Sequence, residues 1–578
     1  MKSRAPLASF VGAVTLCLFG AAVAGQQPPA DAPPAPEPTE VFVETVDVDV
    51  VDVPVVVTDD QGRPILGLTR DDFEVYEDGK RMELTNFYSV AHGQRLADAG
   101  EAGVPPLPGP GQPREQRLNL VVLIDSAHLA PGDRRRTLGH LADQLGAMLR
   151  PEDRVMLASV TPELKIVQPL SPELGPTVQS LGRLSRQAPA GVALELRRRQ
   201  VLAIVNNDAA TPTTDSGFGT QVARVEAARA ALQHIRSFGA EADAFNRRTL
   251  VAIEDLVSSL AGLSGRKAVL YVSGGFDQRP AEPLYDFWER VFRDVMNDPS
   301  LGYSAAEFEA NEWDLRHSLS RLVSTASANG VSFYAFDAGG FSAVAPAELG
   351  IGPIDSQLVR ATADDEPLLY MAGATGGSAL LSANDPGELL ARIEDDYNDY
   401  YSLGYMSPRS RDGRHHRIEV RIPGRGFRIR HPTVYEGKST ELRMTERTLS
   451  ALLLDATDNP LEVEVKLGPQ ERNGRRSLLP VFVTVPYDKL VLVPRGDSHE
   501  GRVSIYIVVG DEAGRMSPPR RIEVPVSVPD ALLDETRGKF FGYGVKLEVR
   551  RGPGRLAIGV RDDVAAVSST VNVPIEKS

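Results

Sequence analysis

The pattern of apolar and polar positions changes several times along this chain. Residues 118–124 form an almost uninterrupted apolar run that ends at Asp125. A run of this kind, bounded by turn residues, is typical of a strand buried on both faces of a parallel sheet. Similar runs alternate with segments of helical leucine spacing as far as residue 405. This alternation predicts an α/β domain with a central, mostly parallel sheet and helices on both faces.

The pattern also gives the approximate extent of each element in this domain. The expected strands cover residues 118–125, 154–160, 164–169, 268–273 and 331–336, and the expected helices cover 135–150, 221–236, 250–263, 315–326 and 388–397. In open α/β sheets, ligands bind outside the carboxyl ends of the strands. Asp125, which follows the first apolar run, is therefore a candidate site residue.

Outside this domain, strand-length segments separated by turn residues predict β structure. We expect the following organisation: a signal peptide at 1–24, a Pro/Ala-rich linker at 25–40, an N-terminal β unit at 41–95, a Pro/Gly-rich linker at 96–117, the α/β domain at 118–405 with insertions near 187–219 and 278–311, a β extension at 406–436, and an Ig-like β-sandwich at 437–578. Both tryptophans of the chain, Trp288 and Trp313, lie in or near the second insertion. Clustered aromatic residues indicate either a local core or a binding face, and the local core is the commoner of the two.

The first residues have the composition of a secretory signal. Lys2 and Arg4 precede an apolar, small-residue segment at 7–23, and Ala-Val-Ala at 22–24 fits a cleavage site. The alternative is that this segment is retained as an N-terminal anchor. The chain's one cysteine, Cys17, lies within it, so cleavage would leave no disulfide and no thiol chemistry. We expect export to the periplasm, cell surface or medium, with no stable membrane span after cleavage.

The net charge of the chain argues against nucleic acid as a partner. The formal net charge is −15, whereas proteins that bind a phosphate backbone need a basic face. Nucleic acid is therefore not an expected partner.

Three stretches together resemble the secreted bacterial proteins with a von Willebrand factor type A (VWA)-related domain, a group expanded in Acidobacteria. They are GRPILGLTRDDFEVYEDGKRMELTNF (62–87), LNLVVLIDSAHL (118–129) and YYSLGYMSPRSRDGRHHRIEVRIPGRGFRIRHPTVY (400–435). The resemblance covers about residues 40–435. It implies a Rossmann-like VWA core flanked by β elements, and it implies no defined biochemical activity.

VWA domains often bind Mg²⁺ at a metal-ion-dependent adhesion site. The resemblance implies an Asp-x-Ser-x-Ser loop, a later Thr and a later Asp as oxygen ligands. Asp125 stands at the first position, but Ala127 and Leu129 replace the two serines. The alternative role for Asp125 is structural, as a cap that accepts backbone N–H bonds at the start of a loop or helix.

The other ligand positions are less well defined. Thr220, or Thr214, stands where the resemblance places the Thr, and Asp277 lies a few residues beyond the position of the later Asp. The weak metal candidates are thus Asp125, Thr220 and Asp277, in a degenerate site. No cofactor is expected, with Mg²⁺ or Ca²⁺ as the ion if the site is rebuilt.

No segment carries a complete catalytic pattern. Ser273 ends an apolar run, but the leading Gly of a nucleophile elbow is absent, and His415-His416 has no carboxylate at a metal-binding helical spacing. We therefore expect an exported, non-enzymatic protein that mediates protein–protein interaction or adhesion through an unknown protein partner. One alternative is a structural component of the envelope. Another is an exported hydrolase or metalloenzyme that uses Asp125, His128, Ser273 and Asp277.

Overall fold

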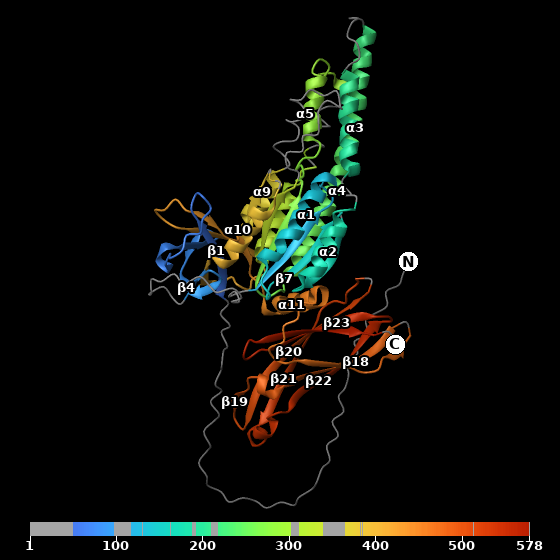
Figure 1. Cartoon of the computed structure of the whole chain (residues 1–578). Helices are drawn as coiled ribbons and strands as arrows, with labels where there is room; N and C mark the ends of the chain where they lie inside the picture. The colour runs from blue at the N-terminus through green and yellow to red at the C-terminus, as the bar shows by residue number, and fades with distance from the viewer. Residues whose placement is uncertain are drawn as a thin grey trace, which may run out of the picture. The chain divides into compact units, whose positions relative to one another are not determined.

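The chain folds into a mixed α/β structure with several sheets (Figure 1). This computed structural model describes residues 50–96, 117–129, 131–161, 163–187, 192–209, 218–301, 311, 313–338, 365–381, 383, 385–474, 476–512 and 514–576. The expected signal peptide, the first linker and nearly all of the second linker lie outside these residues. No helix within the described ranges combines the length and apolarity needed to cross a membrane.

A six-stranded sheet forms the centre of the α/β domain, with the order β11-β10-β9-β6-β7-β8. Its strands are β6 (Leu118–Asp125), β7 (Arg154–Val160), β8 (Leu164–Ser171), β9 (Arg266–Ser273), β10 (Val331–Asp337) and β11 (Ser378–Leu380). The order is that of doubly wound dinucleotide-binding sheets, 3-2-1-4-5-6 in chain order. All neighbours are parallel except β8, which pairs antiparallel with β7. The strands expected from the apolar runs are confirmed within a few residues.

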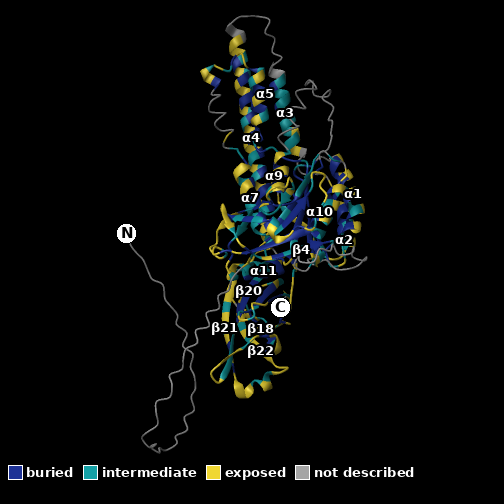
Figure 2. Ribbon diagram, turned by 90° about the vertical axis from the view of Figure 1, so that its left-hand side faces the viewer, coloured by how far each residue is buried: buried dark blue, intermediate teal, exposed yellow. Residues whose placement is uncertain are grey.

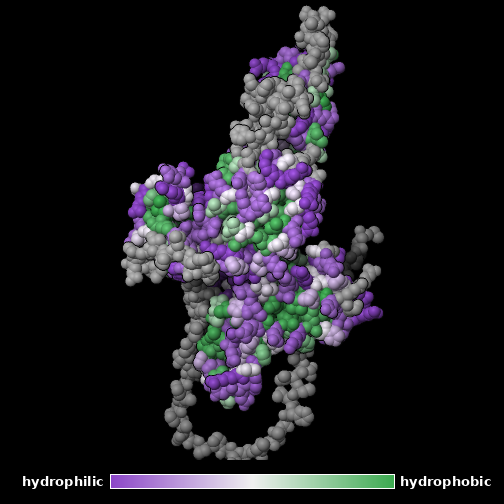
Figure 3. All heavy atoms as spheres, viewed as in Figure 1, coloured by the Kyte–Doolittle hydropathy of each residue, from purple (hydrophilic) through white to green (hydrophobic). Residues whose placement is uncertain are grey.

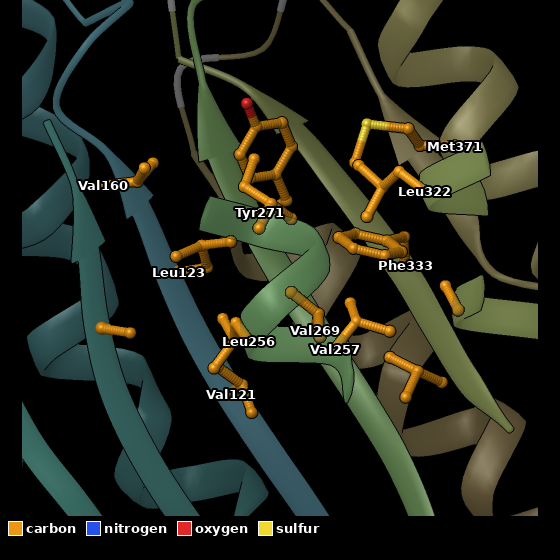
Figure 4. Packing of buried hydrophobic residues seen from close by; sticks show 14 of the residues in the cluster. Val121, Leu123, Val160, Leu256, Val257, Val269, Tyr271, Leu322, Phe333 and Met371 are labelled. Atoms are coloured by element: carbon orange, nitrogen blue, oxygen red, sulfur yellow. The ribbon is translucent and has the colours of Figure 1, made fainter. Parts of the chain in front are cut away.

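Helices cover both faces of this sheet. The apolar side chains of its central strand point alternately to either side, so both faces must be buried. Val121 and Leu123 of β6 join one core cluster, whereas Leu120 and Val122 join the other. The first cluster includes residues of α4 (Phe218–Leu260), α7 (Arg316–Ala328) and α9 (Glu366–Ala374), and the second includes residues of α1 (Pro131–Met148), α2 (Leu174–Leu184) and α10 (Gly387–Asn398). Figure 4 shows part of the first cluster. Burial on both faces explains why β6 lacks polar alternation.

Helix α4 is a single 43-residue helix, where the sequence predicted two helices at 221–236 and 250–263. Its C-terminal part packs in the sheet core. Its N-terminal part packs in a separate cluster with α3 (Val192–Ala209) and α5 (Glu282–Val291). We call α3, α5 and this part of α4 the helical module. The two expected insertions thus contribute helices to one module, whose exposed and buried faces are seen in Figure 2.

The aromatic residues of the second insertion form a core of their own. Trp288 and Phe292 are fully buried in the helical module, and the indole N–H of Trp288 donates to the carbonyl of Ala228 at 2.9 Å. A Cβ on Gly239 in α4 would lie 2.1 Å from the ring of Trp313. Gly239 therefore permits close packing rather than ending the helix. The local-core interpretation of the tryptophans is confirmed.

The N-terminal β unit and the β extension form one β domain. The strands are β1 (Val50–Thr58), β2 (Glu74–Glu77), β3 (Lys80–Met82), β4 (Leu84–Ala91), β5 (Gln94–Leu96), β12 (Tyr400–Met406), β13 (His415–Arg421), β14 (Arg428–Arg430) and β15 (Val434–Glu436), with η1 (Arg70–Asp72) between β1 and β2. They make two sheets, β14-β1-β12-β4-β5 and β15-β13-β2-β3, around one apolar cluster. The expected boundary between residues 405 and 406 falls within β12, which lies between β1 and β4 and so belongs to this domain.

The C-terminal region begins with a helix that the strand pattern did not predict. Helix α11 (Thr440–Leu454) is capped by the preceding residue, Ser439, whose hydroxyl accepts from the N–H of Leu442 at 3.1 Å. The strands that follow are β16 (Glu464–Leu467), β17 (Glu471–Asn473), β18 (Arg476–Pro486), β19 (Val493–Arg495), β20 (Ser498–Asp511), β21 (Arg520–Pro529), β22 (Phe540–Arg550), β23 (Gly554–Asp562) and β24 (Ser568–Ile575). They form two sheets that share one core cluster, which is the general arrangement of a β-sandwich.

Candidate functional site

Asp125 and Ser273 meet at the carboxyl edge of the central sheet. Asp125 ends β6 and Ser273 ends β9, and these two strands are parallel neighbours. The strand order of the sheet reverses between them. Such a topological switch point is where doubly wound proteins form their ligand crevice. The sequence therefore places its candidate carboxylate where the fold offers a site.

The carboxylate of Asp125 is fully buried and accepts five hydrogen bonds from protein donors. Its Oδ1 accepts from the backbone N–H groups of Ala127 at 3.0 Å and His128 at 3.2 Å. Its Oδ2 accepts from the hydroxyl of Tyr271 at 2.5 Å, the hydroxyl of Ser273 at 2.9 Å and Nδ1 of His128 at 2.8 Å. The two bonds at Oδ1 have the geometry of the structural cap that the sequence offered as the alternative role.

The side chain of His128 is positioned as the counter-charge of this carboxylate. Its Nδ1 faces Asp125, and its Nε2 lies 2.9 Å from Oδ1 of Asn246 on α4. Because both neighbouring atoms are oxygens that only accept, the ring donates from both nitrogens, as an imidazolium does. Burial alone would raise the pKa of Asp125, but the His128 charge and the hydrogen bonds outweigh it and lower that pKa. Burial and the adjacent carboxylate raise the pKa of Tyr271.

The neighbouring positions offer few oxygens to a metal ion. Ala127 and Leu129 are each 2% exposed, and Leu129 belongs to a core cluster. The hydroxyl of Ser126 lies 2.9 Å from that of Ser159 and is buried. The residues that replace the two serines of the adhesion-site pattern therefore pack in the protein interior.

The other two metal candidates are not brought into a ligand group with Asp125. Thr220 falls in the first turn of α4, but nothing is described of its side chain. Thr214 lies wholly outside the described residues. Asp277 caps the turn before α5, where its Oδ1 accepts from the N–H of Arg279 at 3.1 Å. Within the described residues, neither Asp125 nor Asp277 belongs to a set of three His, Asp or Glu side chains close enough to share an ion.

Three of the residues named for a hydrolase do converge, but in an order that does not activate a nucleophile. The Ser273 hydroxyl donates to the carboxylate of Asp125, and Nε2 of His128 faces Asn246. A Ser-His-Asp triad instead needs the serine hydroxyl on the imidazole, which removes its proton. Here Asp125 lies between the serine and the histidine, so the imidazole does not accept from the Ser273 hydroxyl.

A second cluster, not found from the sequence, lies in the β domain. Glu77 and Asp78 at the β2–β3 turn approach His416 on β13 closely enough to hold a metal ion in common. The ring of His416 lies between two carboxylates, with Nδ1 2.9 Å from Asp78 and Nε2 3.0 Å from Asp412. Although burial opposes it, hydrogen bonding to these carboxylates raises the pKa of His416. A protonated His416 forms an ion pair with each of the two carboxylates, and a metal cation would have to displace its proton.

The sequence does not predict this cluster, because its residues come from distant parts of the chain. His416 and Asp78 are 338 residues apart and meet only through the antiparallel pairing of β13 with β2. The residues Asp78-Gly79 predict a hairpin turn, but nothing in the sequence around Asp78 or His416 indicates that the two residues meet. Local spacing could not find such a pair.

Comparison with known proteins adds little to this geometry. No protein-family model matches the chain, and no curated protein matches it. Among solved structures, an X-ray structure of a Northeast Structural Genomics Consortium target is similar at 14% sequence identity, with a TM-score of 0.14, over 21% of this chain and 89% of that chain. A similarity of this size supports no argument about fold or function.

Proposed function

We propose that this chain is an exported, non-enzymatic protein that binds a protein partner, with a VWA-related α/β domain and an Ig-like C-terminal sandwich. The observation that carries the proposal is the closed network around Asp125. At the switch point of the sheet, the polar side chains bind one another and leave no paired nucleophile and base. The same network leaves Asp125 without a free lone pair for Mg²⁺, which favours recognition without metal.

We propose the helical module as the surface that binds the partner, and its position supports this. Helix α4 ends just before the amino end of β9, and α5 follows the carboxyl end of β9. The N-terminal part of α4 therefore extends past the carboxyl edge of the sheet, beside α5 (Figure 1). This is the edge at which α/β proteins bind ligands. The module's aromatic residues form its own core, so contacts would be made by exposed positions such as Leu196 and Val222, which are 58% and 43% exposed.

Hydrophilic residues cover most of the described surface seen in Figure 3. A surface of this kind suits reversible association of an exported protein, since obligate interfaces are more apolar. Export itself rests on the signal-like N-terminus.

Site-specific photo-crosslinking tests this proposal. A photoreactive residue at Leu196 or Val222 of the full chain, expressed in its own cells, should capture a discrete protein partner. The same residue at Phe482 on β18, 52% exposed, is the matched control and should capture none. Equal capture at all three positions, or none at the module, would contradict the proposal.

A serine-reactive fluorophosphonate probe tests the opposing hydrolase interpretation. We expect the probe to label the wild-type chain no more than the Ser273→Ala variant. Labelling that depends on Ser273 would show that the network opens to form a nucleophilic site, and the protein would then be an enzyme.

A further inference from the structure

A cavity of about 660 Å³ lies at the opposite, amino-terminal edge of the central sheet. Its walls come from the starts of β6 and β7, the loop between α4 and β9, the segment after α11 and the start of β24. The lining residues are Arg117, Asn119, Arg154, Gly262, Leu263, Ser264, Gly265, Arg447, Ala456, Thr457, Asp458, Asn459, Ser568 and Thr570. The volume falls within the range of small-molecule sites.

Three arginines line this cavity, and the side chains of two of them make no direct polar contact with the described part of the chain. The guanidinium groups of Arg117 and Arg154 form no hydrogen bond or ion pair with any described residue, whereas that of Arg447 donates to the hydroxyl of Ser568 at 2.5 Å. Asp458 is the one acidic residue in the lining. The lining therefore carries a formal charge of about +2, in a chain whose net charge is −15.

Two other partly buried guanidinium groups in the described residues are paired with carboxylates. Arg430 is held by Asp396, and Arg247 by Asp243 at 2.8 Å. Arg154 is half-buried beside a like charge. Burial and the charge of Arg117 lower its pKa and outweigh the opposing charges of Asp458 and Asp455. A bound anion would relieve both effects, since an opposite charge favours the ionised guanidinium.

The walls of the cavity are fixed by hydrogen bonds. The amide of Asn119 donates to the carbonyl of Ser264 at 2.9 Å. The N–H of Asp458 donates to the carbonyl of Thr570 at 3.2 Å, and the N–H of Gly262 donates to the hydroxyl of Ser450 at 3.1 Å. A site with fixed walls loses little conformational entropy when a ligand binds.

We propose that this cavity binds a small molecule that carries phosphate or carboxylate groups. Arg117 and Arg154 supply the forked donors that match these groups, and Arg447, already oriented by Ser568, contributes a third charge. The site lies away from the helical module and does not depend on the function proposed for it.

Isothermal titration calorimetry on the full chain tests the proposal, with pyrophosphate and citrate as the two probes. We expect saturable binding of at least one probe at a single site; the tighter of the two identifies the phosphate or the carboxylate class. Arg154→Gln should weaken binding about tenfold or more, the effect of losing one hydrogen bond between charged groups. Arg117→Gln should act similarly, and because Arg117 is exposed this variant should fold normally.

Arg135→Gln is the matched control, because it removes the same charge from the exposed surface of α1. It should leave the affinity unchanged. Two results would overturn the proposal: no saturable binding of either probe, or equal weakening by all three substitutions. The second result would mean that only the overall charge of the chain matters.

Discussion

Asp125 shows how one carboxylate can hold a strand end together. Its two oxygens connect the loop after β6, the end of β9 and, through His128, helix α4. Removing one member of a buried ion pair leaves the other without its counter-charge and typically costs about 3–5 kcal/mol. We expect Asp125→Asn to lower the free energy of unfolding by about that amount, because the imidazolium of His128 then loses its partner.

Chemical denaturation of the full chain, monitored by circular dichroism, measures this change in the free energy of unfolding. Ser273→Ala is the comparison, since it removes one neutral donor and should cost about 1–3 kcal/mol. An Asp125→Asn variant no less stable than Ser273→Ala would show that Asp125 and His128 are not an ion pair.

The same network predicts the response to divalent cations. Because both oxygens of Asp125 already accept from protein donors, Mg²⁺, Mn²⁺ and Ca²⁺ should give no saturable heat that depends on this residue. Calorimetry on the full chain beside Asp125→Ala tests this expectation. Saturable binding that the substitution abolishes would instead establish a rebuilt adhesion site and metal-dependent capture of the partner.

His416 predicts a pH dependence of stability in the β domain. Its pKa is raised in the folded protein from the ordinary value of 6.5, so its stabilising contribution is complete below about pH 6.5 and is lost as the pH rises through the folded pKa. The pKa values of Asp78 and Asp412 are lowered by their bonds to His416, so both remain ionised at pH 5.

Thermal unfolding of wild type and His416→Gln across pH 5 to 9 measures this contribution. The wild-type advantage in Tm should be greatest near pH 5 to 6 and should shrink towards pH 9. His317→Gln, at an exposed position on α7, is the control and should show no such trend. An advantage that grows with pH would mean that His416 is neutral when folded.

At the scale of single elements, the sequence was most informative where burial is complete. The strands β6, β9 and β10 were predicted because apolar side chains on both faces leave a continuous run. Helix α11 was missed because it lies between strands, with a capping serine as its main signal. The carboxylate of Asp125 was predicted, but its donor Tyr271 and Asn246, the second partner of His128, come from distant elements and left no local pattern.

Helix α4 provides a test of packing against helix propensity. Replacing Gly by Ala within a helix normally stabilises it by about 1 kcal/mol. At Gly239, however, the added Cβ would lie 2.1 Å from the Trp313 ring, so we expect Gly239→Ala to destabilise the helical module. Hydrogen exchange of α3 and α5 should become faster in this variant.

Gly139→Ala on α1 is the matched control, because nothing lies within 4 Å of the added Cβ. It should raise the stability of the chain slightly. Slower exchange in α3 and α5 of Gly239→Ala would contradict this prediction. The contact between α4 and Trp313 would then not be tight, and Gly239 would merely lower the helix propensity of α4.

At the scale of the whole molecule, pairing between distant segments determines which parts belong together. Strand β1 pairs with β12, and β2 pairs with β13, so residues before and after the α/β domain build one β domain. The α/β domain is thus inserted between two halves of a β structure. Local patterns predicted both halves as β segments, but pairing over more than 300 residues is not encoded in any local spacing.

Helix α11 links the α/β domain to the C-terminal sheets. The hydroxyl of Ser450 accepts from the N–H of Gly262 and donates to the carbonyl of Ser259 at the end of α4. A Cβ on Gly262 would lie 2.2 Å from the backbone oxygen of Glu446, and a backbone atom cannot move aside unless the helix moves. We expect Gly262→Ala to displace α11 and to weaken the coupling between the two parts.

Differential scanning calorimetry of the full chain would detect this weakening. Wild type should unfold the two parts in overlapping transitions, whereas Gly262→Ala should separate them, because the contact that couples them is lost. Ser450→Ala removes the two hydrogen bonds without a steric clash and should give a smaller separation. Since both substitutions act on one contact, the separation in the double variant should be smaller than the sum of the separations in the two single variants. Fully additive effects would show that Gly262 and Ser450 act independently and that α11 is not the coupling element.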